Sequence, residues 1–259
     1  SQRPKRRYGT LKAKRVRSRA QTVASGAVSG SNSRIGSRVR LNASLAERWS
    51  TWSMPTAREE RLRHHWDEGA ERYDERIAPL ERRYLAASRA WVGERARGEV
   101  LEVAIGTGLN LPHYGRDTRL TAVELSEGML AVARRRMTQL GLDVDARVGD
   151  GQDLPFDDGS FDAVVCTYSL CGFEDHRRGI EEMVRVLRPG GSLLLADHVG
   201  STNPVFRVGQ WLLQAVTIPL QGEHFTRRPR LVVESMRLEV VAADRLHHGF
   251  IERVHARRQ

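Results

Sequence analysis

The 259-residue sequence has little cysteine and no long apolar run. Its two cysteines, Cys166 and Cys171, have no partners at zinc-site spacing, so we expect neither a disulfide framework nor a metal site. No uncharged apolar run reaches the roughly 18 to 20 residues that a membrane-spanning helix needs. With no secretory leader recognisable, the sequence predicts a cytoplasmic protein with reduced thiols.

Acidic residues are absent from residues 1–40, which hold 12 of the 42 lysines and arginines. The rest of the chain has 30 basic and 32 acidic residues, so the net charge of +10 resides in this tail. A nearly neutral remainder argues against a specific nucleic-acid partner. We expect residues 1–45 to be disordered. The tail is interpreted as a solvated extension, with loose binding to a polyanion or anionic membrane and an organelle transit peptide as alternatives.

A third glycine is missing from the most informative stretch, residues 100–111 (VLEVAIGTGLNL). A predicted strand, residues 100–104, runs into a turn at Gly106 and Gly108, which brings bare backbone close to a nucleotide-like ligand. A second strand, residues 120–123, delivers Glu124 to accept the hydroxyls of a ribose. Nicotinamide enzymes use three glycines to hold a pyrophosphate, but Leu111 stands at the third position. A phosphate-free adenosine cofactor, S-adenosylmethionine, therefore fits better.

Strands and helices alternate further along the chain, which predicts a parallel sheet with right-handed crossovers. Helical spacing over residues 180–187 ends at the turn Arg188–Gly191. Asp150 would lie at the carboxyl end of a third strand, where its carboxylate could meet the adenine amino group. The three further strands are expected at residues 146–148, 161–165 and 192–196.

Taken together, these motifs resemble class I S-adenosylmethionine-dependent methyltransferases, in the branch that contains ubiquinone and menaquinone methyltransferases. The resemblance covers about residues 60–259 and implies a Rossmann-like, doubly wound α/β fold. Its seven-stranded sheet is mostly parallel with an antiparallel last strand, and an N-terminal helical cap precedes it. The matching pieces are Glu102-x-x-x-Gly106-Thr107-Gly108, Glu124, Gly149-Asp150, Leu154-Pro155-Phe156, Ser160-Phe161-Asp162 and Leu187-Arg188-Pro189-Gly190-Gly191.

The resemblance also implies which residues hold the cofactor. Ala70-x-x-Tyr73-Asp74 is similar to a segment that folds over the cofactor, with Tyr73 bonding its methionine carboxylate. Ala104 stands where the family often has glycine, and we expect its methyl group to pack against the sheet. The implied cofactor-binding set is Tyr73, Glu102, Ala104, Gly106, Thr107, Gly108, Glu124, Leu125, Asp150, Gly151 and Tyr168.

The acceptor is expected beyond the carboxyl ends of the fourth and fifth strands. His198 is the candidate general base there, oriented by Asp197, and His224 is the alternative. An apolar insertion, residues 200–228, stands where relatives build a lid over the acceptor. It could also pack onto the domain or contact a membrane interface through Trp211 and Arg207.

Residues 197–199 and 222–227 further resemble methyltransferase-like thiol methyltransferases and phosphatidylethanolamine N-methyltransferases. The predicted domains are a basic tail (1–45), a helical cap with an aromatic stripe (46–97) and a cofactor-binding domain (98–259). The predicted function is methyl transfer to a small, apolar acceptor such as a lipid, thiol or quinone-like molecule. A nicotinamide-dependent oxidoreductase and a catalytically degenerate binding protein remain alternatives, and the sequence gives no prediction for oligomeric state.

Overall fold

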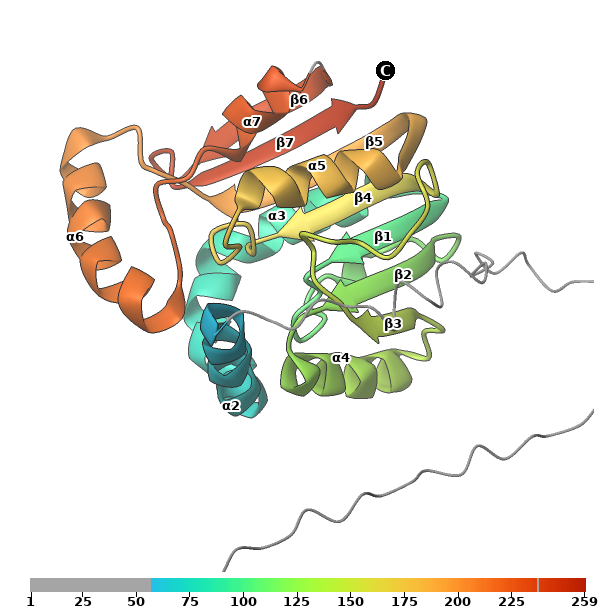
Figure 1. Cartoon of the computed structure of the whole chain (residues 1–259), viewed down its shortest axis with the longest axis horizontal. Coiled ribbons are helices and arrows are strands. Elements are labelled where there is room, and N and C mark those ends of the chain that lie inside the picture. The colour runs from blue at the N-terminus through green and yellow to red at the C-terminus, as the bar shows by residue number, and fades with distance from the viewer. Residues whose placement is uncertain (1–56, 237) are drawn as a thin grey trace, which may run out of the picture. The chain divides into compact units, whose positions relative to one another are not determined.

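A single seven-stranded sheet forms the centre of the computed structural model, which describes residues 57–236 and 238–259 (Figure 1). The strand order is β3-β2-β1-β4-β5-β7-β6. Strands β1 to β5 pair in parallel, and β7 is antiparallel to both β5 and β6. The predicted sheet is therefore confirmed. The strands are β1 (Glu99–Val103), β2 (Arg119–Glu124), β3 (Asp145–Val148), β4 (Phe161–Thr167), β5 (Leu187–His198), β6 (Glu239–Leu246) and β7 (Ile251–Arg257).

The helices cover both faces of this sheet, which explains why its central strands are apolar without alternation. All five residues of β1 are buried. Leu101 packs in one core cluster with α5, while Val100 packs in the other with α3 and α4. The helical elements are α2 (Ala57–Leu80), the π-helical turn η1 (Glu81–Leu85), α3 (Ala86–Gly93), the short helix η2 (Leu111–His113), α4 (Glu127–Leu140), α5 (His176–Val186), α6 (Pro204–Gln221) and α7 (Pro229–Ser235).

Side-chain caps fix where three of the helices begin. Ser126 accepts a hydrogen bond from Met129 N at the start of α4, and Asp175 and Asn203 cap α5 and α6 in the same way. The tail predicted for residues 1–45 and the first part of the predicted cap, up to residue 56, lie outside the described residues.

The turn predicted at residues 188–191 belongs instead to β5, as an irregularity inside the strand. Phe161 pairs with Leu187 and Ala163 pairs with Ser192, so six residues of β5 lie opposite three of β4. Gly190 takes a φ of 78° there, and its N–H donates to Arg258 O. Proline and a left-handed glycine thus interrupt the ladder without ending the strand.

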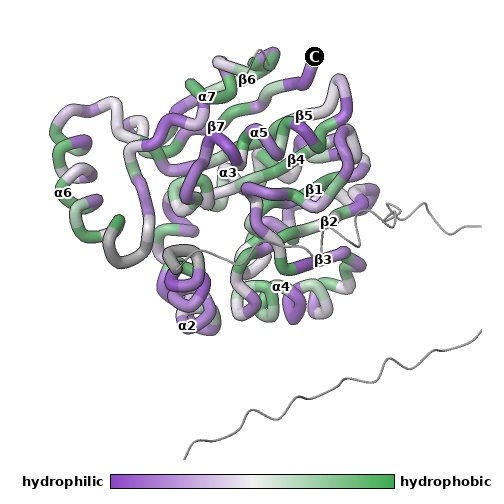
Figure 2. Tube along the Cα trace, in the orientation of Figure 1, coloured by the Kyte–Doolittle hydropathy of each residue, from purple (hydrophilic) through white to green (hydrophobic). Residues whose placement is uncertain are grey.

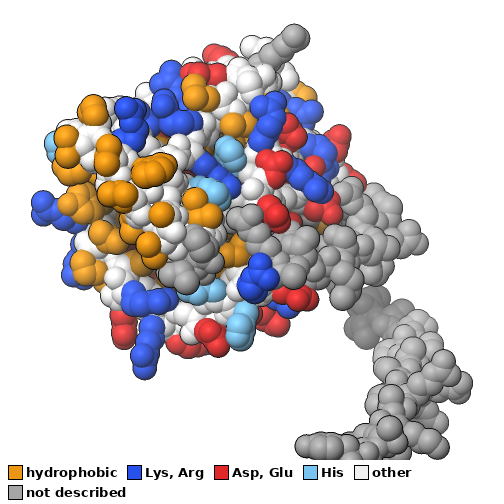
Figure 3. Space-filling model, turned by 60° about the vertical axis from the view of Figure 1, so that its left-hand side comes forward, with side chains coloured by type: hydrophobic (Ala, Val, Ile, Leu, Met, Phe, Trp, Pro, Cys, Tyr) orange, Lys and Arg blue, Asp and Glu red, His pale blue; other side chains and the backbone are white. Residues whose placement is uncertain are grey.

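Helix α6 buries two glutamines and leaves seven large apolar side chains exposed. Gln210 and Gln214, one turn apart, are buried and bond backbone groups of residues 199, 201 and 226. Trp211, by contrast, is 67% exposed. Figures 2 and 3 show the apolar residues along α6 and their gathering on the surface. The exposed large apolar side chains of α6 are Val205, Phe206, Val208, Trp211, Leu212, Leu213 and Val216.

Among the described residues, no helix combines the length and the apolar character needed to cross a bilayer.

The contrast between the buried sheet and the exposed face of α6 predicts that two truncations have unequal effects on stability. Leu194, in β5, is fully buried, so Leu194→Ala should lower the free energy of unfolding by about 2 to 5 kcal/mol. Trp211→Ala removes a larger side chain but should change it by less than about 0.5 kcal/mol. Urea unfolding followed by circular dichroism measures both. Equal destabilisation by the two would show that the outward face of α6 is covered in solution.

Candidate functional site

The chain bends sharply where β1 ends, because three residues there adopt left-handed backbone conformations. Ala104, Gly106 and Gly108 have φ values of 56°, 58° and 82°. A Cβ added at Gly106 would meet nothing within 4 Å, whereas one at Gly108 would lie 2.7 Å from Leu111 Cδ1. Gly106 therefore presents bare backbone to a cavity, and Gly108 lets the bend pack against the core. The positive φ at residue 104 is the physical reason for a glycine preference there.

Glu124 brings a carboxylate to this bend from the end of β2. Its Oε2 accepts a hydrogen bond from Gly106 N at 2.8 Å, and its Oε1 accepts one from Ser126 N at 2.9 Å. Burial raises the pKa of Glu124, while these backbone N–H groups act to lower it. The carboxylate is thus held in a fixed position with lone pairs left to accept further hydrogen bonds.

The bend and Glu124 line one cavity, together with the loop after β4 and the inner face of α2. Leu62, Trp66 and Tyr73 reach it from α2. Burial raises the pKa of Tyr73 to about 12, so its hydroxyl stays a hydrogen-bond donor. The remaining wall includes Leu125, Met129 and Phe173, which makes most of the cavity apolar.

Seven of the predicted cofactor-binding residues line this cavity, and four lie elsewhere. Gly108 faces the core, and Asp150 and Gly151 form the turn after β3. Asp150 Oδ1 accepts a hydrogen bond from Gln152 N. The contact proposed between Asp150 and adenine stays a prediction. The seven lining residues are Tyr73, Ala104, Gly106, Thr107, Glu124, Leu125 and Tyr168.

Glu102 is the fourth predicted residue that does not line the cavity, and it belongs to a buried polar network. Its carboxylate accepts hydrogen bonds from Asn110 Nδ2 at 2.8 Å and from Tyr114 OH at 2.9 Å. Burial raises its pKa to about 7. Arg89, from α3, donates to Asn110 Oδ1 and to Thr167 Oγ1, which ties the helical segment to the loop after β1 and to β4.

Arg89 is a cavity-lining residue that the sequence reasoning missed. Its guanidinium lies 4.9 Å from the centre of the Tyr168 ring, and its Nε donates to Glu81. An arginine within an Arg-rich and Glu-rich helix looks like part of a solvated face. Its burial shows only once α3 is placed against the sheet.

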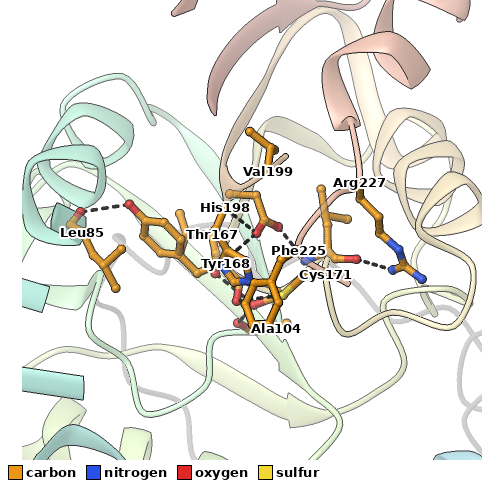
Figure 4. Close-up of polar contacts among 12 residues, drawn as sticks. Leu85, Ala104, Thr167, Tyr168, Cys171, His198, Val199, Phe225 and Arg227 are labelled. Atoms are coloured by element: carbon orange, nitrogen blue, oxygen red, sulfur yellow. Dashed lines mark hydrogen bonds and ion pairs between the residues drawn. The ribbon is translucent and has the colours of Figure 1, made fainter. Parts of the chain in front are cut away.

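The two predicted catalytic residues, Asp197 and His198, are adjacent at the end of β5. Figure 4 shows His198 close to Tyr168 and Phe225. Asp197 Oδ2 accepts a hydrogen bond from Leu170 N, and Oδ1 accepts one from His198 N, both at 2.8 Å. Asp197 thus holds the loop after β4 in place. Its contact with the imidazole is longer, 3.4 Å from Oδ1 to Nδ1.

The His198 imidazole packs between two aromatic rings. It stacks on Tyr168 with ring centres 6.4 Å apart and tilts against Phe225 at 4.8 Å. Its Nε2 is buried and has no hydrogen-bond partner among the described residues. Burial lowers the pKa of His198, so the ring is neutral near pH 7 and Nε2 or Nδ1 can accept a proton.

The structure also brings Cys171 close to Asp197 and His198, which its position in the sequence did not indicate. Potential metal-ligand atoms of Cys171, Asp197 and His198 lie within 4.8 Å of one another. Both oxygens of Asp197 already accept backbone hydrogen bonds.

A second cavity lies beyond His198, between η1, the start of α6 and the β6–β7 turn. Its lining includes His198, His247, His248, Phe206 and Phe250. An extended segment would send adjacent histidines to opposite faces. His247 and His248 instead form a tight turn, and both reach the same cavity.

Comparisons with known proteins agree with this geometry. The methyltransferase domain family matches residues 101–195. Phosphatidylethanolamine N-methyltransferase of Cereibacter sphaeroides is 38% identical over 103 residues, which are 39% of this chain and 51% of the relative. Demethylmenaquinone methyltransferase of Corynebacterium glutamicum is 40% identical over 109 residues, which are 42% of this chain and 45% of the relative. The chain thus spans about half the length of the curated relatives it matches.

Over residues 101–195, the chain is thus similar to the methyltransferase domain family. The fold likeness extends further than the sequence match. Geranyl diphosphate C-methyltransferase of Streptomyces coelicolor, solved with S-adenosyl-L-homocysteine, superposes with a TM-score of 0.61 at 18% identity. The superposition covers 80% of this chain and 100% of that one.

The methyltransferase domain contains the glycine bend, Glu124 and the loop after β4. Tyr73, Arg89, His198 and the second cavity lie outside the residues that the domain family matches. The domain family therefore matches the part of the chain that holds the glycine bend and Glu124, and the rest of the two cavities lies outside that match.

The raised pKa of Asp197 predicts that the stability of the fold depends on pH. Burial raises its pKa from 3.8 to about 7, so the folded state holds the proton more tightly than the unfolded state does. Its stabilising contribution is fully present below pH 3.8 and is lost as the pH rises through about 7. The free energy of unfolding should therefore fall over this range, by at most about 1.4 kcal/mol per pH unit for one group.

Asp197→Asn should make this fall shallower, because the amide does not titrate. Urea unfolding at a series of pH values measures the slope, with Asp157→Asn on an exposed turn as the matched control. The same slope in the wild type and in Asp197→Asn would contradict the assignment.

Proposed function

We propose that this protein is an S-adenosylmethionine-dependent methyltransferase that acts on a small, apolar acceptor. The observation that carries the proposal is the contact between the Glu124 carboxylate and Gly106 N at the mouth of one apolar cavity. The methyltransferase domain supports the same reaction class. Leu111, at the third position of the glycine turn, is buried, which leaves no bare backbone there for a pyrophosphate.

The residues of the first cavity fit this cofactor. Open space over Gly106 admits a ligand close to the backbone, and Glu124 is placed to accept both ribose hydroxyls. Leu125 and Met129 offer apolar contact to the adenine ring. The Tyr73 hydroxyl, held protonated by burial, can donate to the methionine carboxylate. When bound, S-adenosylmethionine supplies a methyl group already activated by its sulfonium.

The remaining task of the protein is to orient the acceptor and to exclude water. Aromatic side chains from α2 and the loop after β4 close the cavity on two sides. We propose His198 as the group that can take a proton from the acceptor, with Asp197 holding its backbone in place. The segment 200–228 forms the outer boundary of the acceptor side in this proposal.

Cofactor binding tests the ribose contact. Glu124→Ala should weaken S-adenosylhomocysteine binding by about 1.5 to 3 kcal/mol, because it removes charge-assisted hydrogen bonds. Isothermal titration calorimetry measures the difference. Glu127→Ala, three residues away on the exposed face of α4, should bind like the wild type. No binding by the folded wild type would reject the methyltransferase proposal, and unchanged affinity in Glu124→Ala would reject the ribose contact.

We also propose that the protein works in the cytoplasm, peripherally at an anionic membrane, with α6 as the contact. Helix α6 has seven exposed large apolar side chains, no acidic residue and an exposed Arg207. Arg228, between α6 and α7 in the sequence, is exposed as well. An outward apolar face edged by arginines suits the interface of a bilayer with anionic headgroups. Two buried unpaired cysteines suit a reducing compartment.

Vesicle sedimentation tests the membrane contact. Replacing Trp211 and Leu212 by glutamate should reduce binding to phosphatidylglycerol-containing vesicles by about tenfold or more, because two apolar anchors become charged. Leu140→Glu changes an exposed leucine on α4 and serves as the control. Since the basic N-terminal residues are the same in all variants, equal binding by wild type and double variant would assign the attachment to another part of the chain.

A further inference from the structure

The lining of the second cavity combines basic and apolar side chains without any carboxylate. Its volume is about 580 Å³, within the range of roughly 300 to 1,000 Å³ that small-molecule sites occupy. None of the nine lining residues is acidic. Such a lining suits a ligand that has both an anionic group and an apolar chain. The polar groups are the Arg83 guanidinium, the Tyr84 hydroxyl and three imidazoles, and the other lining residues are Leu85, Phe206, Phe250 and Ile251.

The guanidinium of Arg83 has no carboxylate partner among the described residues. Its Nε donates to the Tyr84 hydroxyl at 2.7 Å, and the guanidinium carbon lies 5.4 Å from the centre of the Tyr84 ring. Glu81, two residues earlier, accepts instead from Arg89 at 3.0 Å. The positive charge of Arg83 and its terminal N–H groups are therefore available to an anion in the cavity.

The turn between β6 and β7 brings two imidazoles to this cavity in a strained backbone conformation. His247 and His248 have φ values of 52° and 57°, where hairpin turns strongly favour glycine and asparagine. His247 meets the Tyr84 ring at 4.9 Å between centres, and His248 meets the Phe206 ring at 5.7 Å. Neither imidazole has a hydrogen-bond partner among the described residues. A turn that keeps two imidazoles at one cavity despite this strain indicates a use for their N–H groups.

The apolar part of the cavity continues onto the exposed face of α6. Phe206 lines the cavity, lies 5.4 Å from the Phe250 ring and is itself 44% exposed. Val205 and Val208, beside it on the helix, are exposed as well. An apolar chain held in the cavity can therefore extend along α6 while it stays in contact with apolar side chains.

A wall of two rings separates this cavity from the first one. Tyr168 lines the first cavity and His198 lines the second, and the two rings stack with their centres 6.4 Å apart. The Tyr168 hydroxyl also donates to O of Leu85, another residue of the second cavity, at 3.1 Å. A ligand of the second cavity is thus kept away from the methyl group of a cofactor in the first. Its role is attachment, and methyl transfer takes place elsewhere.

We propose that the second cavity binds one anionic phospholipid of the membrane that α6 contacts. The phosphate of the lipid accepts hydrogen bonds from Arg83, His247 and His248, and its acyl chain passes Phe206 towards the exposed face of α6. The inference rests on the proposed membrane contact and adds to it a site that selects the lipid by its charge. A free phosphodiester offers the same phosphate but lacks the chain, so the two sources can be distinguished.

Three water-soluble probes test the ligand class without a bilayer. Dihexanoylphosphatidylglycerol, below its micelle-forming concentration, has both the anionic headgroup and the chains. Dihexanoylphosphatidylcholine has the same chains but no net charge, and glycerophosphoglycerol has the same headgroup without chains. Calorimetry on the full chain should show the first probe binding at least about tenfold more tightly than either of the others. Equal affinity for the choline lipid would overturn the selection by charge, and equal affinity for glycerophosphoglycerol would overturn the lipid assignment.

Two adjacent arginines test the location. Arg83→Gln removes the charge at the cavity and should weaken dihexanoylphosphatidylglycerol binding by about tenfold. Arg82→Gln removes the same charge from the neighbouring exposed position of η1, which does not line the cavity, and should bind like the wild type. An equal loss in both variants would reveal a general effect of charge and reject the site.

A variant of the turn tests the imidazoles. Replacing His247 and His248 by glycine suits the left-handed backbone, so the fold should be retained while both rings are lost. Binding of dihexanoylphosphatidylglycerol should fall by about tenfold. The affinity for S-adenosylhomocysteine should not change, because the ring wall separates the cavities. Unchanged lipid affinity in this variant would reject the second cavity as the site.

The membrane contact itself is tested separately, by vesicle sedimentation of the variant in which Trp211 and Leu212 are glutamate. Since the short-chain probe is dissolved as single molecules, its binding does not require a bilayer. Failure of the wild type to bind this probe, with vesicle attachment intact, would reject the lipid site alone. Failure of the wild type to attach to vesicles would reject the membrane contact and the inference that rests on it.

Discussion

The carboxylate of Glu124, held between the N–H groups of Gly106 and Ser126, is the contact on which the rest of the site depends. It joins the ends of β1 and β2 and fixes the open side of the glycine bend. Because the carboxyl ends of parallel strands meet at one edge of the sheet, everything that follows β1, β2, β4 and β5 gathers around this point. Position in the fold, more than any single side chain, therefore defines where the cofactor can lie.

The helical segment before β1 is held against this site by hydrogen bonds of its polar and charged side chains. Arg89 reaches Asn110 and Thr167 from α3, and Thr107 Oγ1 donates to Asp74 of α2. These bonds hold α2 and α3 over the bend, with Tyr73 and Trp66 facing the cavity. The segment thus serves as a wall of the binding site, and removing its polar contacts would leave charged groups buried without partners.

Helix α6 packs differently from the helices that cover the sheet. Helix α6 is attached by two buried glutamines and leaves its apolar residues exposed, which reverses the usual arrangement of a surface helix. The second cavity begins beside Phe206, at the start of this helix.

Much of the fold could be predicted from the sequence, because the strands before and after the glycine bend are continuous apolar runs and their order fixes a parallel sheet. Glu124 could be placed for the same reason, since it ends such a run. The sequence analysis placed Glu102 among the cofactor-binding residues, but its buried hydrogen bonds could not be predicted, because its partners Asn110 and Tyr114 come from a loop whose path the pattern does not specify.

Tertiary contacts also decide the roles of the histidines. In an extended segment His247 and His248 would point to opposite faces, but the left-handed turn places both at one cavity. The proximity of Cys171 to Asp197 and His198 likewise depends on the pairing of β4 with β5.

A crystal structure of the protein grown with S-adenosylhomocysteine would test the central claim most directly. The account predicts density for the nucleoside in the first cavity, with both ribose hydroxyls on the Glu124 carboxylate and the chain at Gly106 against the ligand. Ligand density away from Glu124, or a first cavity that stays filled by protein side chains while the ligand binds elsewhere, would contradict it.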